Sequence, residues 1–504
     1  MLQAAAAPKV LPNGTAVDPE PENKLYGNSE LIRSQNKTER VLVPVKDISK
    51  DHVGQTIWVR GRVYRSREQG NSVFIVLRQS FATIQVPIFK GGHITKGWVK
   101  WAGNLTRESI VEMEVTVQAA EVASCTQTEV EIVPQQMFCI SPCIQALPFN
   151  LEDAARSKTD IENPPEGEAY VNVLQDLRLD NRCLDIRTPA NQAIFRIQSH
   201  VCRLFREFTA RNGFTEIHSP KIIPAASESG ASVFKLGYFG EDAFLAQSPQ
   251  LYKQMALSGD LERVCEIGPV FRAENSNTHR HLCEFTGMDI EMTIKEHYHE
   301  VLEMLNGIFV NIFDGLNEQQ ELLAAVNAQY PFEPLVYPRE MLIISFAEGI
   351  QMLRDAQVEG WEDLSEDEDI GTTHERQLGG LVKEKYGTDF YCMDKFPVSA
   401  RPFYTMLQEI DGKVTTNSYD IYIRGEEILS GAQRVHDPEI LEQRIKDLGL
   451  PSADLQDYID AFKLGVPPHG GGGIGLERVV MLFLGLPNIR LVSLFPRTPI
   501  RNRP

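Results

Sequence analysis

Five short segments in the first third of the chain alternate apolar and polar residues with a period of two, and this pattern constrains the fold more than any other feature. Such alternation is typical of β-strands with one buried face. The segments lie near residues 59–64, 73–78, 84–88, 111–117 and 129–132. Turn signals such as Gln69-Gly70-Asn71 separate them. The spacing predicts a small β-barrel of about 100 residues, over residues 38–145.

The distribution of charge indicates what this barrel binds. The whole chain has a formal net charge of −19, which by itself argues against a nucleic-acid partner. Residues 41–107, however, carry eleven Lys and Arg against three acids. A basic barrel of this size favours an OB-fold that binds nucleic acid. The densest acidic block, residues 359–369 with seven acids in eleven positions, is predicted to be a solvated surface loop.

Outside the barrel the chain divides into three further segments. Residues 1–37 are rich in Ala, Pro, Asn and Gly without periodicity, and we expect a flexible tail there. Residues 146–188 contain prolines and are mixed in character, which favours a hinge. An amphipathic helix is predicted from Pro189 to just before Gly213. Over residues 189–504 strand-like and helical stretches mix without regular βαβ alternation, which predicts a large antiparallel α+β domain.

The sequence favours a cytoplasmic protein without membrane contact. The longest apolar run, Val479 to Leu486, is far shorter than the ~20 residues that a membrane span needs. The first residues resemble neither a secretory signal nor a mitochondrial transit peptide. The eight cysteines form no CxxC pair, so we expect reduced thiols rather than a zinc site or a disulfide scaffold.

Two stretches carry candidate chemistry, and the first is residues 271–285 (FRAENSNTHRHLCEF). It joins two apolar, strand-like segments through a polar loop. A hairpin there would present Arg272, Arg280 and His281 together, and such a cationic cluster suits a polyphosphate. The alternative is a surface loop with incidental salt bridges.

The second stretch, residues 469–484 (HGGGGIGLERVVMLFL), has five glycines within six positions, and Arg478 lies near the start of the apolar run that follows. Glycines permit close approach of the backbone to a ligand, and the apolar run predicts a helix. The pattern lacks the Gly-Lys-Ser/Thr of a Walker loop and the third glycine of a dinucleotide-binding fingerprint. A glycine run alone is a weak signal.

Together these stretches resemble motifs 2 and 3 of the class II aminoacyl-tRNA synthetases, and the segment that ends in FTEIHSP (214–220) resembles motif 1. The class I signatures HIGH and KMSKS are absent. An OB-fold ahead of the catalytic domain marks the aspartyl, asparaginyl and lysyl subgroup. Three further segments resemble the aspartyl-tRNA synthetase family, namely SESGASVF (227–234), AQSPQLYKQM (246–255) and GEEILSGAQR (425–434). The 183 residues between motifs 2 and 3 (286–468) lack the large inserted domain of bacterial forms, so the chain resembles the archaeal and eukaryotic cytosolic type.

The resemblance implies an aspartate–tRNA ligase. Such an enzyme activates L-aspartate with ATP to aspartyl-adenylate and pyrophosphate, and then transfers aspartate to the 3′ end of tRNA-Asp. The implied catalytic residues, Arg272 and Arg478, would hold the α- and γ-phosphates of ATP. The other ATP-binding residues implied are Glu274, Arg280, His281, Phe285 and Glu427, with Phe285 stacked on the adenine ring. Glu427 and Ser430 match the Mg²⁺ ligands of the family, a hard-oxygen set suited to bridging phosphates.

The resemblance also implies an aspartate pocket. Lys253 and Arg434 would bind the side-chain carboxylate of the substrate. The rest of the implied pocket is Ser227, Gln250, Asp289 and Ser430, with Glu228 in a mobile loop. Two cations would reject asparagine, whose neutral amide cannot replace a carboxylate, and discrimination of about 10⁴ is expected. Without the resemblance, Lys253 would be interpreted as a solvated helix lysine.

The implied partners are tRNA-Asp and a second copy of the chain. Phe74 and Gln85 match family positions that contact anticodon bases. Phe74 and Arg78 share the strand face opposite the barrel core, where a ring can stack on a base and a cation can meet a phosphate. The alternative for Phe74 is a surface residue that caps the barrel. Pro220 closes motif 1, at the interface of a homodimer.

Three different functions stay open at this stage. An asparaginyl-tRNA synthetase shares the scaffold but needs a pocket for a neutral amide, which Lys253 and Arg434 disfavour. A non-catalytic RNA-binding paralogue would keep the barrel and lose the catalytic motifs, whereas Arg272, Glu427 and Arg478 are all present. An ammonia-dependent asparagine synthetase would lack the barrel.

Overall fold

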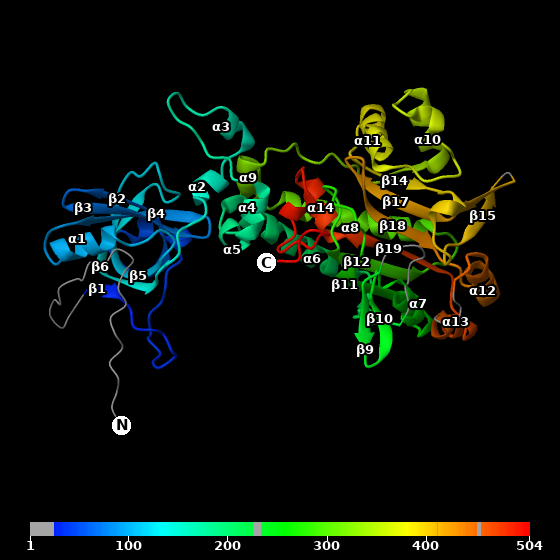
Figure 1. Ribbon diagram of the computed structural model, residues 1–504, viewed down its shortest axis with the longest axis horizontal. Helices are drawn as coiled ribbons and strands as arrows, with labels where there is room; N and C mark the ends of the chain where they lie inside the picture. Colours follow the sequence, from blue (N-terminus) through cyan, green and yellow to red (C-terminus); the bar gives the residue numbers. More distant parts are fainter. Residues whose placement is uncertain (1–24, 225–232, 411, 451–454) are drawn as a thin grey trace. The chain divides into compact units, whose positions relative to one another are not determined.

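The computed structural model describes residues 25–224, 233–410, 412–450 and 455–504. The chain divides into two compact units, residues 1–150 and residues 151–504 (Figure 1). No helix among the described residues is long and apolar enough to cross a membrane. The eight cysteines form no disulfide among the described residues, and five of them are buried.

The first unit is a five-stranded barrel. Its strands are β2 (Thr56–Gln69), β3 (Ser72–Gln79), β4 (Ala82–Phe89), β5 (Ile110–Ala119) and β6 (Val130–Ser141). Strand β2 pairs with β3, β3 with β4, β4 with β6, β6 with β5, and β5 pairs with β2, so the sheet closes on itself. Helix α1 (Lys96–Gly103), which the sequence analysis did not predict, connects β4 to β5. This topology confirms the predicted OB-fold.

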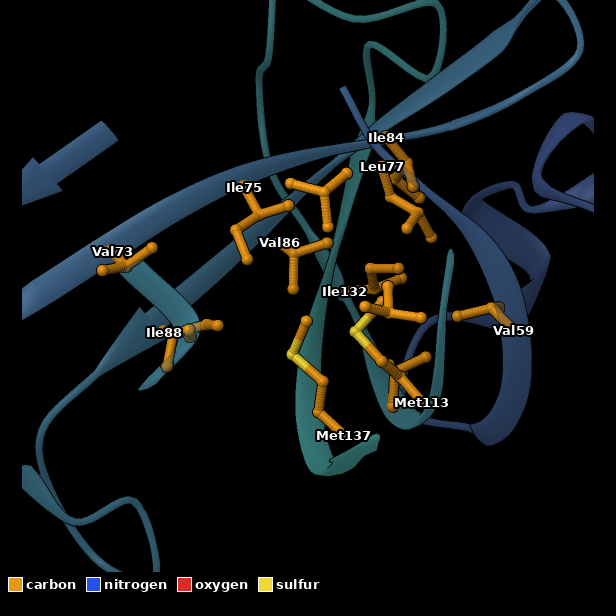
Figure 2. Packing of buried hydrophobic residues seen from close by; sticks show 14 of the residues in the cluster. Val59, Val73, Ile75, Leu77, Ile84, Val86, Ile88, Met113, Ile132 and Met137 are labelled. Atoms are coloured by element: carbon orange, nitrogen blue, oxygen red, sulfur yellow. The ribbon is translucent and has the colours of Figure 1, made fainter. Parts of the chain in front are cut away.

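The predicted alternation decides which side chains fill the barrel. Val73, Ile75 and Leu77 of β3 are fully buried, whereas Phe74 and Val76 between them are only partly buried. Figure 2 shows the buried side chains of β3 among inward-facing residues of the other strands, including Ile84, Val86, Ile88, Met113, Ile132 and Met137. Burial of this apolar face contributes about 25 cal/mol per Å² and selects one strand register, because a one-residue slip would turn every inward side chain to water.

The structure differs from the predicted tail near the end of that segment. Residues 26–28 form strand β1 (Tyr26–Asn28), which pairs in parallel with β6. Tyr26 is buried, and its ring stacks on Trp98 of α1 with the ring centroids 5.3 Å apart. Pairing with β6 and aromatic contacts with α1 therefore hold a segment whose composition alone predicts a tail. Residues 1–24 lie outside the described part of the chain.

Acidic side chains from the second half of the barrel neutralise much of its basic first half. Residues 108–141 contain six acids and no Lys or Arg. The carboxylate of Glu112 accepts hydrogen bonds from Arg40 and Arg60, and Glu108 accepts one from Arg78 at 2.8 Å. The basic surface of the barrel is therefore smaller than the count over residues 41–107 indicates.

The second unit is built on an eight-stranded sheet. Its order is β13 (Leu342–Ser345), β14 (Phe390–Asp394), β17 (Ser418–Ile423), β18 (Glu426–Gln433), β19 (His469–Gly475), β12 (Glu284–Thr293), β11 (Arg263–Phe271) and β7 (Thr215–Glu216). Neighbouring strands are antiparallel except at the two edges, where β13 pairs in parallel with β14 and β7 with β11. The mainly antiparallel sheet confirms the predicted α+β class.

Smaller sheets and helices surround this sheet. One small sheet holds β8 (Ile222–Ile223), β10 (Glu241–Leu245) and β9 (Lys235–Tyr238), and the other holds β15 (Leu407–Ile410) and β16 (Lys413–Thr416). The longer helices are α6 (Pro189–Arg211), α7 (Gln250–Ser258), α8 (His299–Asn317), α9 (Gln320–Gln329), α10 (Phe346–Asp355), α11 (Thr372–Tyr386), α12 (Pro438–Asp447), α13 (Gln456–Lys463) and α14 (Leu476–Phe483). The acidic block at residues 359–369 lies on the surface with most of its carboxylates exposed, as predicted.

Helix α6 follows its sequence signals closely. Pro189 occupies the first turn, where its missing N–H leaves no helical hydrogen bond unmade. Gly213 follows the helix with φ of +76°, a left-handed conformation that glycine adopts without strain. Ile194, Ile197 and Val201 are fully buried along one face. The periodicity of the apolar residues thus predicted both the helix and the side that it buries.

The segment predicted as a hinge is structured from residue 151 onward. It contains α2 (Leu151–Ala154), α3 (Lys158–Glu162), α4 (Gln175–Asp180) and α5 (Arg182–Asp185). Arg182 is buried, pairs with Asp185 at 2.7 Å, and donates to the carbonyl oxygens of Ser493 and Leu494 at 2.8 and 2.9 Å. Residues 151–188 therefore pack as part of the second unit, and their role as a hinge stays a prediction.

The glycine run forms a central strand rather than a loop. Strand β19 lies between β18 and β12. A Cβ added at Gly471 would lie 2.1 Å from the carbonyl oxygen of Ile290 and 2.5 Å from Oε2 of Glu291. The absence of a side chain therefore permits close strand packing, which the sequence analysis did not anticipate.

We expect Gly471→Ala to destabilise the second unit by about 1–3 kcal/mol, because the added methyl group meets a main-chain oxygen and a buried carboxylate. Chemical denaturation followed by circular dichroism measures the change. Gly380→Ala is the matched control, since Gly380 is exposed on α11 and nothing lies within 4 Å of an added Cβ. A gain of about 0.5–1 kcal/mol is expected there. Equal stabilities of the two variants would contradict the packing explanation.

Candidate active site

A cleft of about 720 Å³ opens beside the centre of the eight-stranded sheet, and it gathers the side chains that the sequence singled out for ATP. Its walls come from β12, β18, β19, the loop after β11 and the start of α14. All seven predicted ATP-binding residues line it: Arg272, Glu274, Arg280, His281, Phe285, Glu427 and Arg478. They come from three separate stretches of the chain, so the fold brings together what the sequence spreads over 207 positions.

The predicted hairpin accounts for the first five of these residues. Strands β11 and β12 pair in antiparallel register from Arg263 opposite Met292 to Phe271 opposite Glu284. The loop between them begins at Arg272, whose guanidinium carbon lies 5.5 Å from the ring centroid of Phe285. The hairpin therefore places a cation over an aromatic ring at the mouth of the cleft, a pair that suits a nucleotide with its phosphate and its base.

Arginines, rather than histidine, supply the positive charge of the cleft. Burial lowers the pKa of His281 below its usual value, and the nearby Arg478 lowers it further, so the ring is mostly neutral at pH 7. Burial alone would raise the pKa of Glu427, but Arg478, Arg272, Arg280 and Arg401 together lower it. Arg478 also donates to the main-chain oxygen of Glu427 at 3.1 Å.

Arg280 already has an acidic partner, which the sequence analysis missed. Its guanidinium pairs with Glu375 of α11 at 2.7 Å, and both side chains are largely buried. Burial raises the pKa of Glu375 to about 7. Since Glu375 lies 95 positions from Arg280, no spacing in the sequence could have indicated the pair. Arg280 lines the cleft but is less available to a ligand than Arg272.

The two cations of the predicted aspartate pocket are buried and share one carboxylate. Lys253 of α7 and Arg434, just after β18, have side chains that are 1% and 5% exposed. Glu291 of β12 accepts from Arg434 Nε at 2.8 Å, and its other oxygen lies 3.3 Å from Lys253 Nζ. Glu291 was not among the predicted residues, although it is fully buried at the centre of the pocket.

Asp289 completes the charge balance of the pocket. Its carboxylate lies 2.9 Å from Lys253 Nζ. Burial raises the pKa of Asp289 despite the opposing effect of Lys253, whereas Arg434 and Lys253 lower that of Glu291 against the effect of burial. Two cations thus face two carboxylates. Asp289 was predicted to line this pocket, whereas Glu291, the second acid, was not.

The spacing of the two acids was the signal that could have found Glu291. Residues two apart on a strand point to the same face. Asp289, already predicted to line the pocket, therefore places Glu291 on the same face of β12, one step farther into the sheet. Gln250 also contacts the pocket, because Arg434 Nη2 donates to its Oε1 atom at 3.0 Å.

The predicted metal ligands lie on one face of β18 because of a bulge. Glu427 and Ser430 are three residues apart, a spacing that puts side chains on opposite faces of a regular strand. The pairing with β17 shifts between Ile421 and Tyr422, so that one extra residue stands between Glu427 and Leu429. The bulge returns Glu427 to the face of Ser430. Glu427 and Ser430 were predicted from the family resemblance, and the spacing within a regular strand would not have placed them together.

The guanidinium group of Arg401 lies beside Ser430. Arg401 donates to the hydroxyl of Ser430 at 2.9 Å and to the carboxylate of Asp420 at 2.8 Å. Asp420 lies opposite Ser430 in the strand register, and burial raises its pKa to about 6. Among the described residues, no group of three or more His, Cys, Asp or Glu side chains is arranged to hold a metal ion. Asp420 and Arg401 are further residues that the sequence analysis missed.

Three predicted residues are not placed at the site by the described part of the structure. Ser227 and Glu228 fall outside the described residues. Pro220 is exposed four residues after β7, and its role at a dimer interface stays a prediction.

On the barrel, two of the three predicted anticodon residues face outward. Phe74 is partly exposed and contacts Phe89 edge to face, with centroids 5.4 Å apart. Gln85 lies on the neighbouring strand and donates to Glu131 at 2.9 Å. Arg78 is buried and paired with Glu108 at 2.8 Å, so it is not the exposed cation that was expected, and its role at the anticodon stays a prediction. The alternation placed Arg78 on the outer face but could not show that Glu108 covers it.

Comparison with known proteins agrees with both units. Residues 174–499 match the family described as tRNA synthetases class II (D, K and N), and residues 57–140 match the OB-fold nucleic acid binding domain. The cytoplasmic aspartate–tRNA ligase of Homo sapiens is 50% identical over 482 residues, which cover 95% of this chain and 94% of the relative.

Solved structures extend this likeness to the fold. An aspartyl-tRNA synthetase from Entamoeba histolytica has a TM-score of 0.87 at 42% identity, covering 98% of this chain and 100% of its own. An asparaginyl-tRNA synthetase from Pyrococcus horikoshii has a TM-score of 0.76 at 29% identity, covering 93% of this chain and 100% of its own. The higher identities, which extend over nearly the whole of each chain, are to the aspartate enzymes. The chain therefore belongs to the class II tRNA synthetases of the D, K and N group, in the family of the aspartate–tRNA ligases.

Proposed function

We propose that the chain is an aspartate–tRNA ligase, which activates L-aspartate with ATP and transfers the aspartyl group to the 3′ end of tRNA-Asp. The observation that carries this proposal is the pair Lys253 and Arg434, buried around Glu291 next to a cleft lined by arginines. A buried pair of cations suits a small anionic side chain, and the arginines suit a polyphosphate.

In the first step a carboxylate oxygen of aspartate attacks the α-phosphorus, and the bond to pyrophosphate breaks. This step needs positioning and charge neutralisation more than covalent help from the protein. Arg272 would hold the α-phosphate, Arg478 the γ-phosphate, and Phe285 the adenine ring. Glu274 would face the adenine, and Arg280 and His281 the phosphates. Their common position along one cleft supports these roles.

Mg²⁺ would be held by Glu427 and Ser430 in this scheme. When bound, it would neutralise charge on the phosphates. The donors are oxygen atoms on one face of a bulged strand, and the lowered pKa of Glu427 keeps its carboxylate ionised at neutral pH. Asp420 lies directly across from Ser430 and is the nearest further carboxylate in the register. The residues present therefore fit a hard divalent cation.

Arg434 is the residue that we assign to the side-chain carboxylate of the substrate, together with Lys253. Nε and Nη2 of Arg434 donate to Glu291, Gln250 and the main-chain oxygen of Gly471. Within the described part of the chain, Nη1 makes no hydrogen bond, which leaves one donor of a rigid fork for a ligand. Gln250 and Asp289 would face the backbone end of aspartate.

The Nη1 group of Arg434, and not the net charge of the pocket, favours aspartate over asparagine. Lys253, Arg434, Asp289 and Glu291 sum to zero when all are ionised, so the preference comes from the bond that the substrate makes to this group. A carboxylate would accept a charge-assisted hydrogen bond from Nη1, whereas a side-chain amide offers only a neutral oxygen, and a site built around such a polar contact discriminates by about 10⁴. This argument and the higher identity to aspartate enzymes disfavour the asparaginyl alternative.

An RNA-binding paralogue and an asparagine synthetase lose support for separate reasons. A paralogue without activity has no use for the arginines that line the cleft. An ammonia-dependent asparagine synthetase has no use for a closed OB barrel. We propose tRNA-Asp as the partner of the barrel, with Phe74 and Gln85 at the anticodon, a homodimer through the motif 1 region around Pro220, and a cytoplasmic location, as in the names of the curated relatives.

Replacement of Arg434 by Leu should abolish aspartate-dependent ATP–pyrophosphate exchange, with a fall of about 10³-fold or more, because the charge-assisted bonds to the substrate are lost. Removing one partner of a buried ion pair also costs about 3–5 kcal/mol of stability. The double variant Arg434→Leu/Glu291→Gln is the control, since it removes the unpaired carboxylate. It should regain stability and remain inactive. Normal exchange in a folded variant would refute the pocket.

Phe74→Ala should raise the KM for tRNA by about 5- to 100-fold, because stacking of one base on a ring contributes roughly 1–3 kcal/mol. Exchange without tRNA should not change, since the barrel takes no part in adenylate formation. Phe74→Leu keeps an apolar side chain on the barrel but has no ring. The two variants should therefore weaken tRNA binding alike, whereas a residue that merely caps the barrel would tolerate Leu.

A further inference from the structure

Two glutamines one turn apart on α7 form a buried chain of hydrogen bonds beneath the amino-acid pocket. Gln250 and Gln254 are 4% and 0% exposed. Nε2 of Gln250 donates to Oε1 of Gln254 at 3.1 Å. Gln250 also meets Arg434, whereas Gln254 is one layer farther from the cleft and meets His469 at 2.9 Å. The proposed function uses Gln250 and leaves Gln254 unexplained.

The direction of the hydrogen bonds in this series is set from both ends. At the pocket, Nε2 of Gln250 also donates to Oε2 of Glu291 at 3.4 Å, and the far end is set by His469. Nδ1 of His469 lies 2.8 Å from the carbonyl oxygen of Pro467, which can only accept, so Nδ1 carries the proton. Burial lowers the pKa of His469 to about 4, and the ring is neutral at pH 7. Nε2 of the ring then has only a lone pair, and Gln254 must turn its NH2 group toward it.

The orientation of the Gln254 amide sets that of the Gln250 amide, one turn closer to the pocket on α7. With its NH2 on His469, Gln254 presents Oε1 to the NH2 of Gln250. Gln250 in turn presents its own Oε1 to Nη2 of Arg434 at 3.0 Å. A reversed amide at either glutamine would set two donors against each other in a buried site. The chain therefore has one polarity, from Arg434 to Pro467.

Tyr458 contacts the middle of this chain of hydrogen bonds, at Gln254. This residue lies on α13, in the helical segment between β18 and β19, and it is buried. Its hydroxyl donates to Oε1 of Gln254 at 2.9 Å. A second donor on the same oxygen makes reversal of the Gln254 amide more costly, because a flipped amide would leave both donors facing an NH2 group.

We propose that Tyr458 and Gln254 are positioning residues for the amino-acid pocket, which fix the amide of Gln250 so that its carbonyl oxygen holds the guanidinium of Arg434 in place. Neither residue touches the substrate. The inference rests on the proposed function, because it gives Arg434 the side-chain carboxylate of aspartate. It adds that α13 contributes to the geometry of this arginine through three side chains, alongside the direct bonds to Glu291 and Gly471.

The test measures ATP–pyrophosphate exchange by the full chain with Mg²⁺, varying aspartate and ATP separately. Tyr458→Phe should raise the KM for aspartate about tenfold, with kcat and the KM for ATP within about threefold of the wild type. Tyr252→Phe is the matched control on α7, since no described residue is a hydrogen-bond partner of its hydroxyl. It should leave the KM for aspartate within about twofold. A general loss of packing would not single out aspartate.

A double-mutant cycle separates the chain of bonds from independent packing effects. Gln254→Met should raise the KM for aspartate about a hundredfold, and adding Tyr458→Phe should change it no further, because the proposed effect of Tyr458 on the pocket passes through its hydrogen bond to Gln254. Multiplied effects, near a thousandfold, would overturn the proposal. So would an unchanged KM for aspartate in Tyr458→Phe, which decides the matter alone if Gln254→Met does not fold.

Failure of the proposed function gives a different result. If the wild-type chain shows no exchange with aspartate, the assignment of the substrate falls. The same cycle is then run with asparagine and on the midpoints of chemical denaturation. Non-additive midpoints together with a selective rise in the KM for the amino acid that supports exchange would support the positioning role. Additive midpoints would overturn it.

Discussion

The carboxylate of Glu291 is the group on which the centre of the second unit depends. It is fully buried and lies within 3.3 Å of both Lys253 and Arg434. Removing an ion from water costs several kcal/mol, and only partners with good geometry offset this cost. None of the three charges is stable at this depth without the others. The arrangement contributes little net stability, but it holds two cations in fixed positions beside a cleft.

The glycine strand makes room for this carboxylate. A side chain at Gly471 would collide with Glu291 and with the main chain of β12, and one at Gly473 would approach Asp289 to 3.0 Å. Asp289 pairs with Gly473 and Glu291 with Gly471, and β19 fits beside both acids because these two positions have no side chain to displace them. The buried acids of β12 therefore require the glycines of β19, although the two segments lie some 180 residues apart in the sequence.

Features with a period along one segment could be predicted, and features that depend on a distant partner could not. The alternation of Val73, Ile75 and Leu77 gave both the strand and its buried face, and the apolar face of α6 gave the helix. The pairing of Arg78 with Glu108 depends on a residue that the fold, and not the local pattern, brings near. The bulge that aligns Glu427 with Ser430 depends likewise on the register with β17, which no spacing within β18 reveals.

The arginines of the cleft differ in a way that their shared motif conceals. Arg280 is 13% exposed and bound to a buried acid at 2.7 Å, whereas Arg272 is 43% exposed and lies 3.9 Å from the half-exposed Glu274. An exposed pair contributes about 0–1 kcal/mol, so a polyphosphate can take Arg272 from its partner at little cost. If a ligand drew Arg280 away, the buried carboxylate of Glu375 would lose its ion-pair partner. Glu375 would then have to be protonated, and burial raises its pKa to about 7. The exposure of Arg272 therefore agrees with its proposed role at the α-phosphate, whereas Arg280, which we also propose to face the phosphates, is at the same time tied to α11 by its pair with Glu375.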